Sequence, residues 1–268
     1  MVMAGDVAVE GCEAPKPGQR MKPDAAVSVR APERYVSRGG LKLEAALAWF
    51  GIDVSGAACA DIGASTGGFT DCLLAHGAAH VMAVDVGASQ MHERLKRDPR
   101  VTLVERCNAR NLGAPGSAGA LAGEAAGATG LPEPPAVFAV DVSFISLAKI
   151  LPALARVAAP GAVLVALVKP QFEAGRADVD KGRGVVRDPA VHRRVLLDAL
   201  SGAPAWGWTP HGVIPSPIEG GSGNREFLMH ATLAPSDGMP DCAPTAPRDW
   251  ADEVDAALAG TNVSPPPA

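Results

Sequence analysis

Four charged side chains of this chain could together remove a proton from a hydroxyl group. They are two lysines and two carboxylates, at Lys42, Asp141, Lys169 and Glu226. Lys169 ends a strongly apolar run, where partial desolvation favours the neutral amine, a usable base. Asp141 also ends an apolar run, and the carboxyl ends of parallel strands share one sheet edge, so these two groups could converge. Taken singly, Lys42 and Glu226 are of residue types that usually lie on the surface. They are candidates for this chemistry only together with Asp141 and Lys169.

A glycine-rich turn at residues 61–70 follows a predicted strand and leads into a predicted helix. Glycines let the backbone approach a ligand closely, and the acid that opens the turn lies at the carboxyl end of its strand. The turn lacks the Lys-Ser/Thr of a phosphate loop and the full G-x-G-x-x-G fingerprint. Its D-x-G-x-x-x-G-G pattern suits a ligand with an amino-acid end and a nucleoside end, which indicates S-adenosylmethionine. A ligand-free turn is the alternative. The expected contacts within the turn are Asp61, Gly63, Ser65, Gly67, Gly68 and Phe69.

Polar residues also follow the next two predicted strands. Asp85 lies roughly twenty residues beyond the glycine-rich turn, where an acid typically accepts hydrogen bonds from ribose hydroxyls. Asn108 follows the third strand, where an amide can read the adenine edge. A helix cap or a solvated strand end is the alternative for Asp85, and a turn residue is the alternative for Asn108. We expect Asp61 near the amino group of the cofactor, and we expect Asp141 to be a further cofactor-binding residue.

Short apolar segments alternate with helical segments through the middle of the chain, which predicts an α/β fold with a doubly wound, mostly parallel, Rossmann-like sheet of seven strands. The predicted strands are 57–61, 81–85, 101–105, 136–141, 162–169, 212–215 and 227–233. The predicted helices are 41–50, 70–75, 147–157 and 190–199, with another near Arg94. Residues 112–135 and 171–188 are expected to be loops, the former with a helical stretch at 118–125.

Composition divides the chain into four regions. Residues 1–31 predict a small β unit with a tight turn at Pro17-Gly18, too small to bury a core alone. Residues 32–40 form a basic linker, and residues 41–233 form the main domain. The segment 234–268 is rich in Pro, Ala, Asp and Gly, and we expect it to be disordered apart from a short helix at 250–258.

The net charge of −5 over 268 residues means that nucleic-acid binding would need local basic patches. Candidates for a basic rim are Arg30, Arg34, Arg38, Arg176, Lys181, Arg183, Arg187, Arg193 and Arg194. The five cysteines are dispersed without a C-x-x-C, which argues against a disulfide framework or a metal site and for a reducing cytosol. With no signal peptide or membrane-length apolar run evident, we expect a cytoplasmic protein without a membrane partner. No motif indicates the oligomeric state.

The Lys-Asp-Lys-Glu order resembles the tetrad of FtsJ-type ribose 2′-O-methyltransferases, and most closely the TlyA branch, also called haemolysin A, which methylates ribosomal RNA. The motifs that carry the resemblance are 35–43 (Tyr-Val-Ser-Arg-Gly-Gly-Leu-Lys-Leu), 61–71, 141–147 (Asp-Val-Ser-Phe-Ile-Ser-Leu), 168–173 (Val-Lys-Pro-Gln-Phe-Glu) and 221–227 (Gly-Ser-Gly-Asn-Arg-Glu-Phe). Together the motifs cover residues 34–233 in the right order. Residues 1–31 resemble only the second half of the family's N-terminal RNA-binding domain, which is like ribosomal protein S-four.

The resemblance implies 2′-O-methylation of ribose, in cytidine of small- or large-subunit ribosomal RNA, with S-adenosylmethionine as cofactor and ribosomal subunits as partners. It also implies that Lys169 is the base or orients the hydroxyl, that Asp141 holds Lys169, and that Lys42 and Glu226 orient the hydroxyl. A non-catalytic ribosome-assembly factor is an alternative. A membrane-active haemolysin would need a long apolar segment, an amphipathic hairpin or a signal peptide. A methyltransferase for planar amines would need an Asn/Asp-Pro-Pro-Tyr type motif, which the segment 141–144 does not match.

Overall fold

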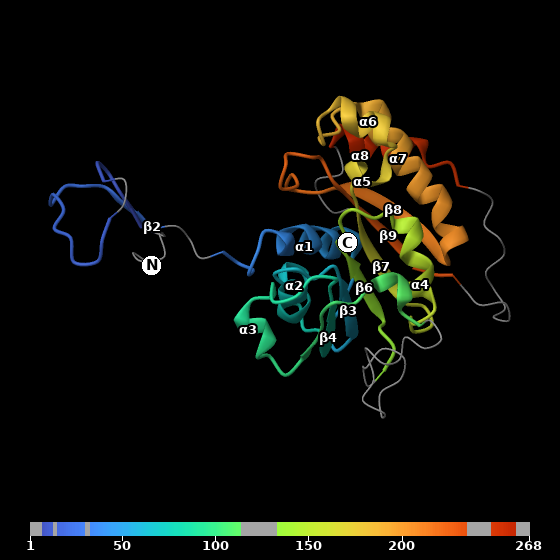
Figure 1. Ribbon diagram of the computed structural model, residues 1–268, viewed down its shortest axis with the longest axis horizontal. Coiled ribbons are helices and arrows are strands. Elements are labelled where there is room, and N and C mark those ends of the chain that lie inside the picture. The colour runs from blue at the N-terminus through green and yellow to red at the C-terminus, as the bar shows by residue number, and fades with distance from the viewer. Residues whose placement is uncertain (1–6, 13–14, 30–32, 114–132, 235–247, 261–268) are drawn as a thin grey trace. The chain divides into compact units, whose positions relative to one another are not determined.

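The computed structural model describes residues 7–12, 15–29, 33–113, 133–234 and 248–260 (Figure 1). The chain divides into two compact units, Met1–Arg34 and Tyr35–Ala268. In the first unit, β1 (Val7–Val9) pairs antiparallel with β2 (Val27–Val29). The predicted turn is confirmed: Gly18 has φ +78°, and the Gln19 N–H donates to the Lys16 carbonyl at 3.1 Å.

The second unit is built on a seven-stranded sheet with the order β5-β4-β3-β6-β7-β9-β8. The strands are β3 (Ala58–Ile62), β4 (His80–Val84), β5 (Val101–Val104), β6 (Val137–Val140), β7 (Val163–Val168), β8 (Trp208–Pro215) and β9 (Phe227–Leu233). The strands β3 to β7 pair in parallel, whereas β9 runs antiparallel to both of its neighbours. The predicted α/β fold with a mostly parallel sheet is confirmed.

Helices cover both faces of this sheet (Figure 1). They are α1 (Gly39–Phe50), α2 (Gly68–Ala75), α3 (Glu93–Lys96), α4 (Leu151–Ala155), α5 (Pro170–Glu173), α6 (Arg176–Lys181), α7 (Pro189–Gly202) and α8 (Ala251–Ala259), with 3-10 turns η2 (Ala109–Asn111), η4 (Leu147–Lys149) and η5 (Ala203–Trp206). Neighbouring strand residues alternate between two cores, since Val81 packs with α1 and α2 while Met82 packs with α4, α7 and α8. Side chains that point alternately to the two faces, and are apolar on both, are typical of a buried parallel sheet.

Some predicted helix bounds differ from the structure. The helix expected at 147–157 is two pieces, η4 capped by Ser146 and α4 ending at Ala155. The segment 171–188, predicted as a loop, contains most of α5, which begins at Pro170, and all of α6. Neither helix has a long apolar stripe, and α6 buries no residue, so hydrophobic periodicity could not reveal them. The helix predicted at 250–258 is confirmed as α8, whereas the stretch 118–125 lies outside the described residues.

The strand order fixes where a ligand can bind. Strand β3 has β4 on one side and β6 on the other, so the chain changes direction across the sheet between them. Open α/β sheets bind ligands at such a switch point, outside the carboxyl ends of the strands. None of the helices within the described residues is long and apolar enough to cross a membrane.

Candidate active site

Asp61 is the penultimate residue of β3, and its side chain is completely buried. Its Oδ2 accepts hydrogen bonds from the Thr70 amide at 2.8 Å and the Thr70 hydroxyl at 2.6 Å. Its Oδ1 has no hydrogen-bond partner within the described part of the chain. Burial raises the pKa of Asp61 to about 7, with smaller contributions from Asp141 and Asp85. A half-satisfied buried acid of this kind is suited to a cationic or hydrogen-bond-donating ligand.

Gly63 brings the turn after β3 against the turn after β6. Its φ of +86° lies in the left-handed region, and a Cβ at this position would overlap the carbonyl oxygen of Asp141. Only glycine fits this close backbone approach at the switch point. Gly67 also has a positive φ, +94°, and caps the start of α2. It lines neither of the two cavities at this edge.

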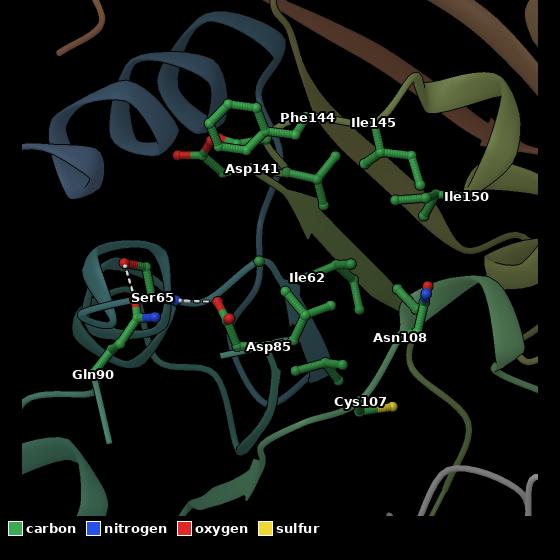
Figure 2. A pocket seen from close by; sticks show the side chains of 16 residues that line it. Ile62, Ser65, Asp85, Gln90, Cys107, Asn108, Asp141, Phe144, Ile145 and Ile150 are labelled. Carbon is green, nitrogen blue, oxygen red and sulfur yellow. Dashed lines mark hydrogen bonds between the residues drawn. The ribbon is translucent and has the colours of Figure 1, made fainter. Parts of the chain in front are cut away.

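The larger cavity, about 380 Å³, lies outside the ends of β3, β4 and β6 (Figure 2). Predicted cofactor residues that line it are Gly63, Ser65, Asp85, Asn108 and Asp141. Asp85 accepts from the Ser65 amide at 2.8 Å and from the Gly87 amide at 2.6 Å, which fixes its carboxylate at the cavity wall. Asn108 caps η2 through its side-chain oxygen. It therefore acts as a turn residue, the alternative stated above, and it also lines the cavity.

A smaller cavity of about 130 Å³ lies beside the first. Predicted residues that line it are Asp61, Gly63, Ser65, Gly68, Phe69 and Asp141. Phe69 is 3 % exposed and belongs mainly to the core under α2. The two cavities share Gly63, Ser65 and Asp141. An elongated ligand could therefore place an amino-acid end near the free oxygen of Asp61 and a nucleoside end near Asp85 and Asn108, as S-adenosylmethionine requires.

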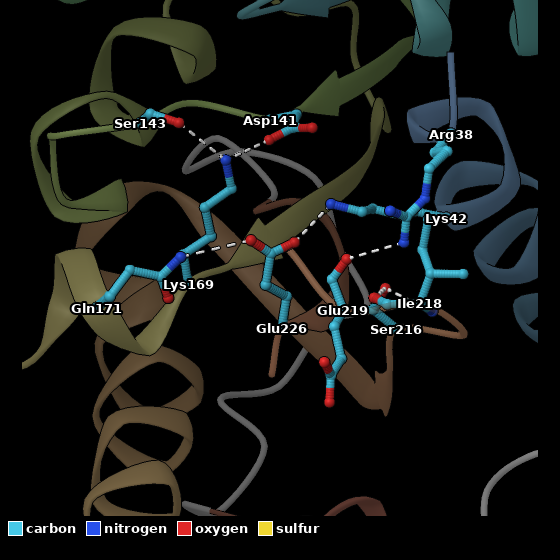
Figure 3. Close-up of polar contacts among 10 residues, drawn as sticks. All are labelled: Arg38, Lys42, Asp141, Ser143, Lys169, Gln171, Ser216, Ile218, Glu219 and Glu226. Atoms are coloured by element: carbon cyan, nitrogen blue, oxygen red, sulfur yellow. Dashed lines mark hydrogen bonds and ion pairs between the residues drawn. The ribbon is translucent and has the colours of Figure 1, made fainter. Parts of the chain in front are cut away.

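The four charged residues form two ion pairs at the same edge of the sheet (Figure 3). Lys42 Nζ lies 2.5 Å from Glu226 Oε2, and Lys169 Nζ lies 2.5 Å from Asp141 Oδ1. Lys169 also donates to Ser143 Oγ at 3.0 Å. Lys42, Lys169 and Glu226 are each less than a tenth exposed. Charges buried this deeply are costly unless they are paired, as they are here.

The topology explains how residues so far apart in sequence meet. Asp141 follows β6, and Lys169 follows β7, which is parallel to β6. Strand β9 is antiparallel, so its first residue, Phe227, lies opposite Val168 at the carboxyl end of β7. Glu226, just before β9, therefore reaches the same edge, and Lys42 on α1 completes the group.

The turn before β9 holds three structural elements through consecutive residues. The buried Asn224 accepts from the Val186 amide at 3.0 Å and donates to the Gly184 carbonyl at 3.1 Å. Arg225 donates to the carbonyls of Leu258 and Ala257, at 2.7 and 2.9 Å, at the end of α8. Glu226 then contacts α1 through Lys42. This turn thus links the loop after α6, the last helix and the ion-pair cluster.

Sequence reasoning did not select Gln90, Ser143, Phe144 or Gln171 as site residues. Gln90 lines the larger cavity and its Oε1 lies 3.1 Å from Ser65 Oγ. Gln171 donates to Glu226 Oε1 at 3.4 Å. Ser143, Phe144 and Gln171 lie within two or three residues of Asp141 or Lys169, which is the signal that could have found them. Gln90 lies in an irregular segment where no such signal exists.

This mostly parallel sheet, with two adjoining cavities at its switch point, defines an α/β protein that binds a ligand at the carboxyl ends of its strands. Comparison with protein families matches residues 35–233 to the family described as FtsJ-like methyltransferase. The chain belongs to this FtsJ-like methyltransferase family.

Individual relatives agree with this assignment. The chain is 48 % identical over 231 residues to YqxC of Bacillus subtilis, provisionally named an rRNA methyltransferase, covering 85 % of this chain and 77 % of YqxC. It is 43 % identical over 231 residues to the 16S/23S rRNA (cytidine-2′-O)-methyltransferase TlyA of Mycobacterium tuberculosis, covering 85 % and 81 %. A solved structure from Streptococcus thermophilus, provisionally named a hemolysin, is 40 % identical, with a TM-score of 0.69, covering 97 % and 88 %.

Proposed function

We propose that the chain transfers a methyl group from S-adenosylmethionine to a ribose 2′-hydroxyl of ribosomal RNA, at cytidine, on one or both ribosomal subunits. The observation that carries this proposal is the position of Asp141. It lines both cavities and also forms an ion pair with Lys169, so one carboxylate would serve both the cofactor and the charges that activate the hydroxyl. The identity to relatives named for rRNA ribose methylation supports the substrate class. A ribosomal substrate would place the protein in the cytoplasm.

The protein's task in this reaction is positioning and removal of one proton. S-adenosylmethionine supplies a methyl group already activated by its sulfonium. Lys169, held by Asp141 and Ser143, would orient the 2′-hydroxyl oxygen, and in its neutral amine form it would take the hydroxyl proton and become the ammonium that pairs with Asp141. Glu226, neutralised by Lys42, would accept a hydrogen bond from the hydroxyl and fix its direction. In this proposal Lys169 and Glu226 contact the hydroxyl, whereas Asp141 and Lys42 hold these two residues in place.

Phe144 would hold the base of the target nucleotide in the proposed reaction. Its side chain is 90 % exposed, its backbone has φ +63°, and its ring lies 4.9 Å from that of Phe172. A bulky residue in the left-handed region is a genuine outlier, and such strain gathers at functional sites. Exposed aromatic rings bind unstacked bases of single-stranded RNA.

Phe144 also lines the larger cavity, so we expect its replacement to weaken RNA use most and cofactor binding less. We expect Phe144→Leu to lower kcat/KM for ribosomal particles roughly ten-fold, since base–aromatic stacking is worth about 1–3 kcal/mol. Phe144→Tyr should retain most of the activity. Steady-state kinetics with varied subunit concentration, together with calorimetric S-adenosylmethionine binding, checks this. Equal losses in the two variants would contradict a stacking role.

Several cations of the predicted basic rim form ion pairs with acidic residues of the protein. Lys181 and Arg194 lie within ion-pair distance of Asp178, and Arg193 pairs with Asp255. These cations are partly neutralised by neighbouring acids, which weakens them as phosphate contacts. We propose that Arg176, Arg183, Arg187 and the first unit, Met1–Arg34, provide most of the RNA contact, the latter as part of an S-four-like domain.

The proposed function is tested by methyl transfer to isolated small and large subunits from cells that lack the enzyme. Radiolabelled S-adenosylmethionine should label RNA in at least one subunit, and ribose-methylation mapping should place the label on a cytidine 2′-oxygen. Label on a base, or on protein, would overturn the substrate assignment. Tight subunit binding without any transfer would favour a non-catalytic assembly role instead.

A further inference from the structure

The glutamine that follows Lys169 and Pro170 is engaged with the ion-pair cluster. Gln171 Nε2 donates to Glu226 Oε1 at 3.4 Å, while Lys42 holds the other oxygen, Oε2, at 2.5 Å (Figure 3). The Glu226 carboxylate is therefore held on both sides, by a cation from α1 and by an amide from α5. Two donors on different oxygens fix its rotation about the terminal bond, which one ion pair alone does not do.

The same amide carries an unsatisfied atom. Gln171 Oε1 is buried and has no hydrogen-bond partner among the described residues. A buried acceptor left unpaired is destabilising, and few occur in a native protein. Turning the amide over would not help, because its oxygen would then face the Glu226 carboxylate and its NH₂ group would take the unpartnered place. The orientation seen keeps the contact to Glu226 and leaves the other end unpaired.

From this arrangement we propose that Gln171 is a positioning residue for Glu226, kept in place at a cost in stability. The proposal rests on the proposed hydroxyl-activating role of Glu226. An apolar side chain of similar volume would bury no unpaired oxygen, so folding alone does not call for an amide here. The 3.4 Å contact is long, as hydrogen bonds of an active site often are before substrate is bound.

Gln171→Met separates positioning from structure because the two roles predict opposite changes in stability. We expect kcat for methyl transfer to fall about 10- to 100-fold, with KM for S-adenosylmethionine within about two-fold of the wild type. The thermal midpoint should stay the same or rise, since the unpaired oxygen is gone. A fall in the midpoint with kcat unchanged would overturn the proposal.

Gln171→Glu adds a readout that a packing role would not move. The titratable groups facing the introduced carboxyl are Glu226 with its partner Lys42, and Lys169 with its partner Asp141. A protonated carboxyl can donate to Glu226 as the amide does, whereas an ionised one repels it. The ratio of variant to wild-type rate should therefore fall as pH rises. A ratio independent of pH would contradict the proposal.

Failure of this inference is distinct from failure of the proposed function. Every assay includes the unsubstituted full-length chain on the same ribosomal particles. If that chain transfers no methyl group, the proposed function is wrong, and the rates of the variants then say nothing about Gln171. If it is active and Gln171→Met matches its kcat, the positioning role alone is wrong.

Discussion

Lys169→Met is expected to reduce methyl transfer by about a thousand-fold or more while leaving S-adenosylmethionine binding within a few-fold of the wild type. Acid–base groups and preorganised charges each contribute rate factors of about 10² to 10⁴. In the proposed reaction Lys169 would combine both roles, because its Nζ lies 2.5 Å from Asp141 Oδ1 and 3.0 Å from Ser143 Oγ at the edge where the hydroxyl would lie. Single-turnover transfer to ribosomal subunits measures the chemical step, and calorimetry measures cofactor binding.

The exposed Lys149, in η4 a few residues beyond the β6 turn, offers the matched control. Lys149→Met removes one lysine from the same part of the molecule, outside the ion-pair cluster, and should leave the rate unchanged. A Lys169→Met variant that transfers methyl groups as fast as Lys149→Met would refute the role given to Lys169. Thermal denaturation of both variants shows whether either change disturbs the fold.

Affinity for S-adenosylmethionine should fall as pH is lowered below about 7. Burial raises the pKa of Asp61 to about 7, so the folded free protein holds this carboxyl neutral below that pH and ionised above it. The cofactor's ammonium group is bound better by the ionised form, and each pH unit below the pKa should weaken binding about ten-fold. Near neutral pH, binding should therefore release a proton. Calorimetry in two buffers of different ionisation enthalpy measures both effects.

Asp61→Asn removes the titration and serves as the internal control. Its cofactor affinity should be lower at pH 8 and should change little from pH 8 to pH 6. The free-protein stability has the opposite dependence. Because the folded pKa is raised, the contribution of Asp61 is fully present below its unfolded value and is lost as pH rises towards 7. A wild-type affinity that stays constant across this range would refute the assignment of Asp61 to the ammonium group.

Much of the fold followed from sequence because it depends on local patterns. The apolar runs at β3, β4, β6 and β7 are buried on both faces, and each lies within about one residue of its predicted bounds. Strand β8 begins four residues earlier than its predicted start, at Trp208 rather than Gly212. The alternation that would extend it is interrupted by Pro210 and by an irregular register at Pro210/Gly212. Periodicity does not carry across such a break.

The site was only partly accessible from sequence. A strand end is a recognisable place for chemistry, which led to Asp61, Asp85, Asp141 and Lys169. The pairing of Lys42 with Glu226 depends on the antiparallel pairing of β9 with β7. No local sequence pattern predicts which strand β9 pairs with or in which direction. Which residue pairs with which, and which oxygen is left unpaired, are properties of three-dimensional packing.

The contact of Arg225 with α8 has a consequence for handling this enzyme. The guanidinium donates to two carbonyl groups in the last turn of α8, those of Leu258 and Ala257, and its chain neighbour is Glu226. Shortening the protein before Ala251, or fusing a bulky tag directly onto α8, would free this arginine beside the acid. The helix α8 thus helps to hold the turn that carries Glu226. Truncated versions of the protein should therefore be assayed for methyl transfer before they are used in place of the full chain.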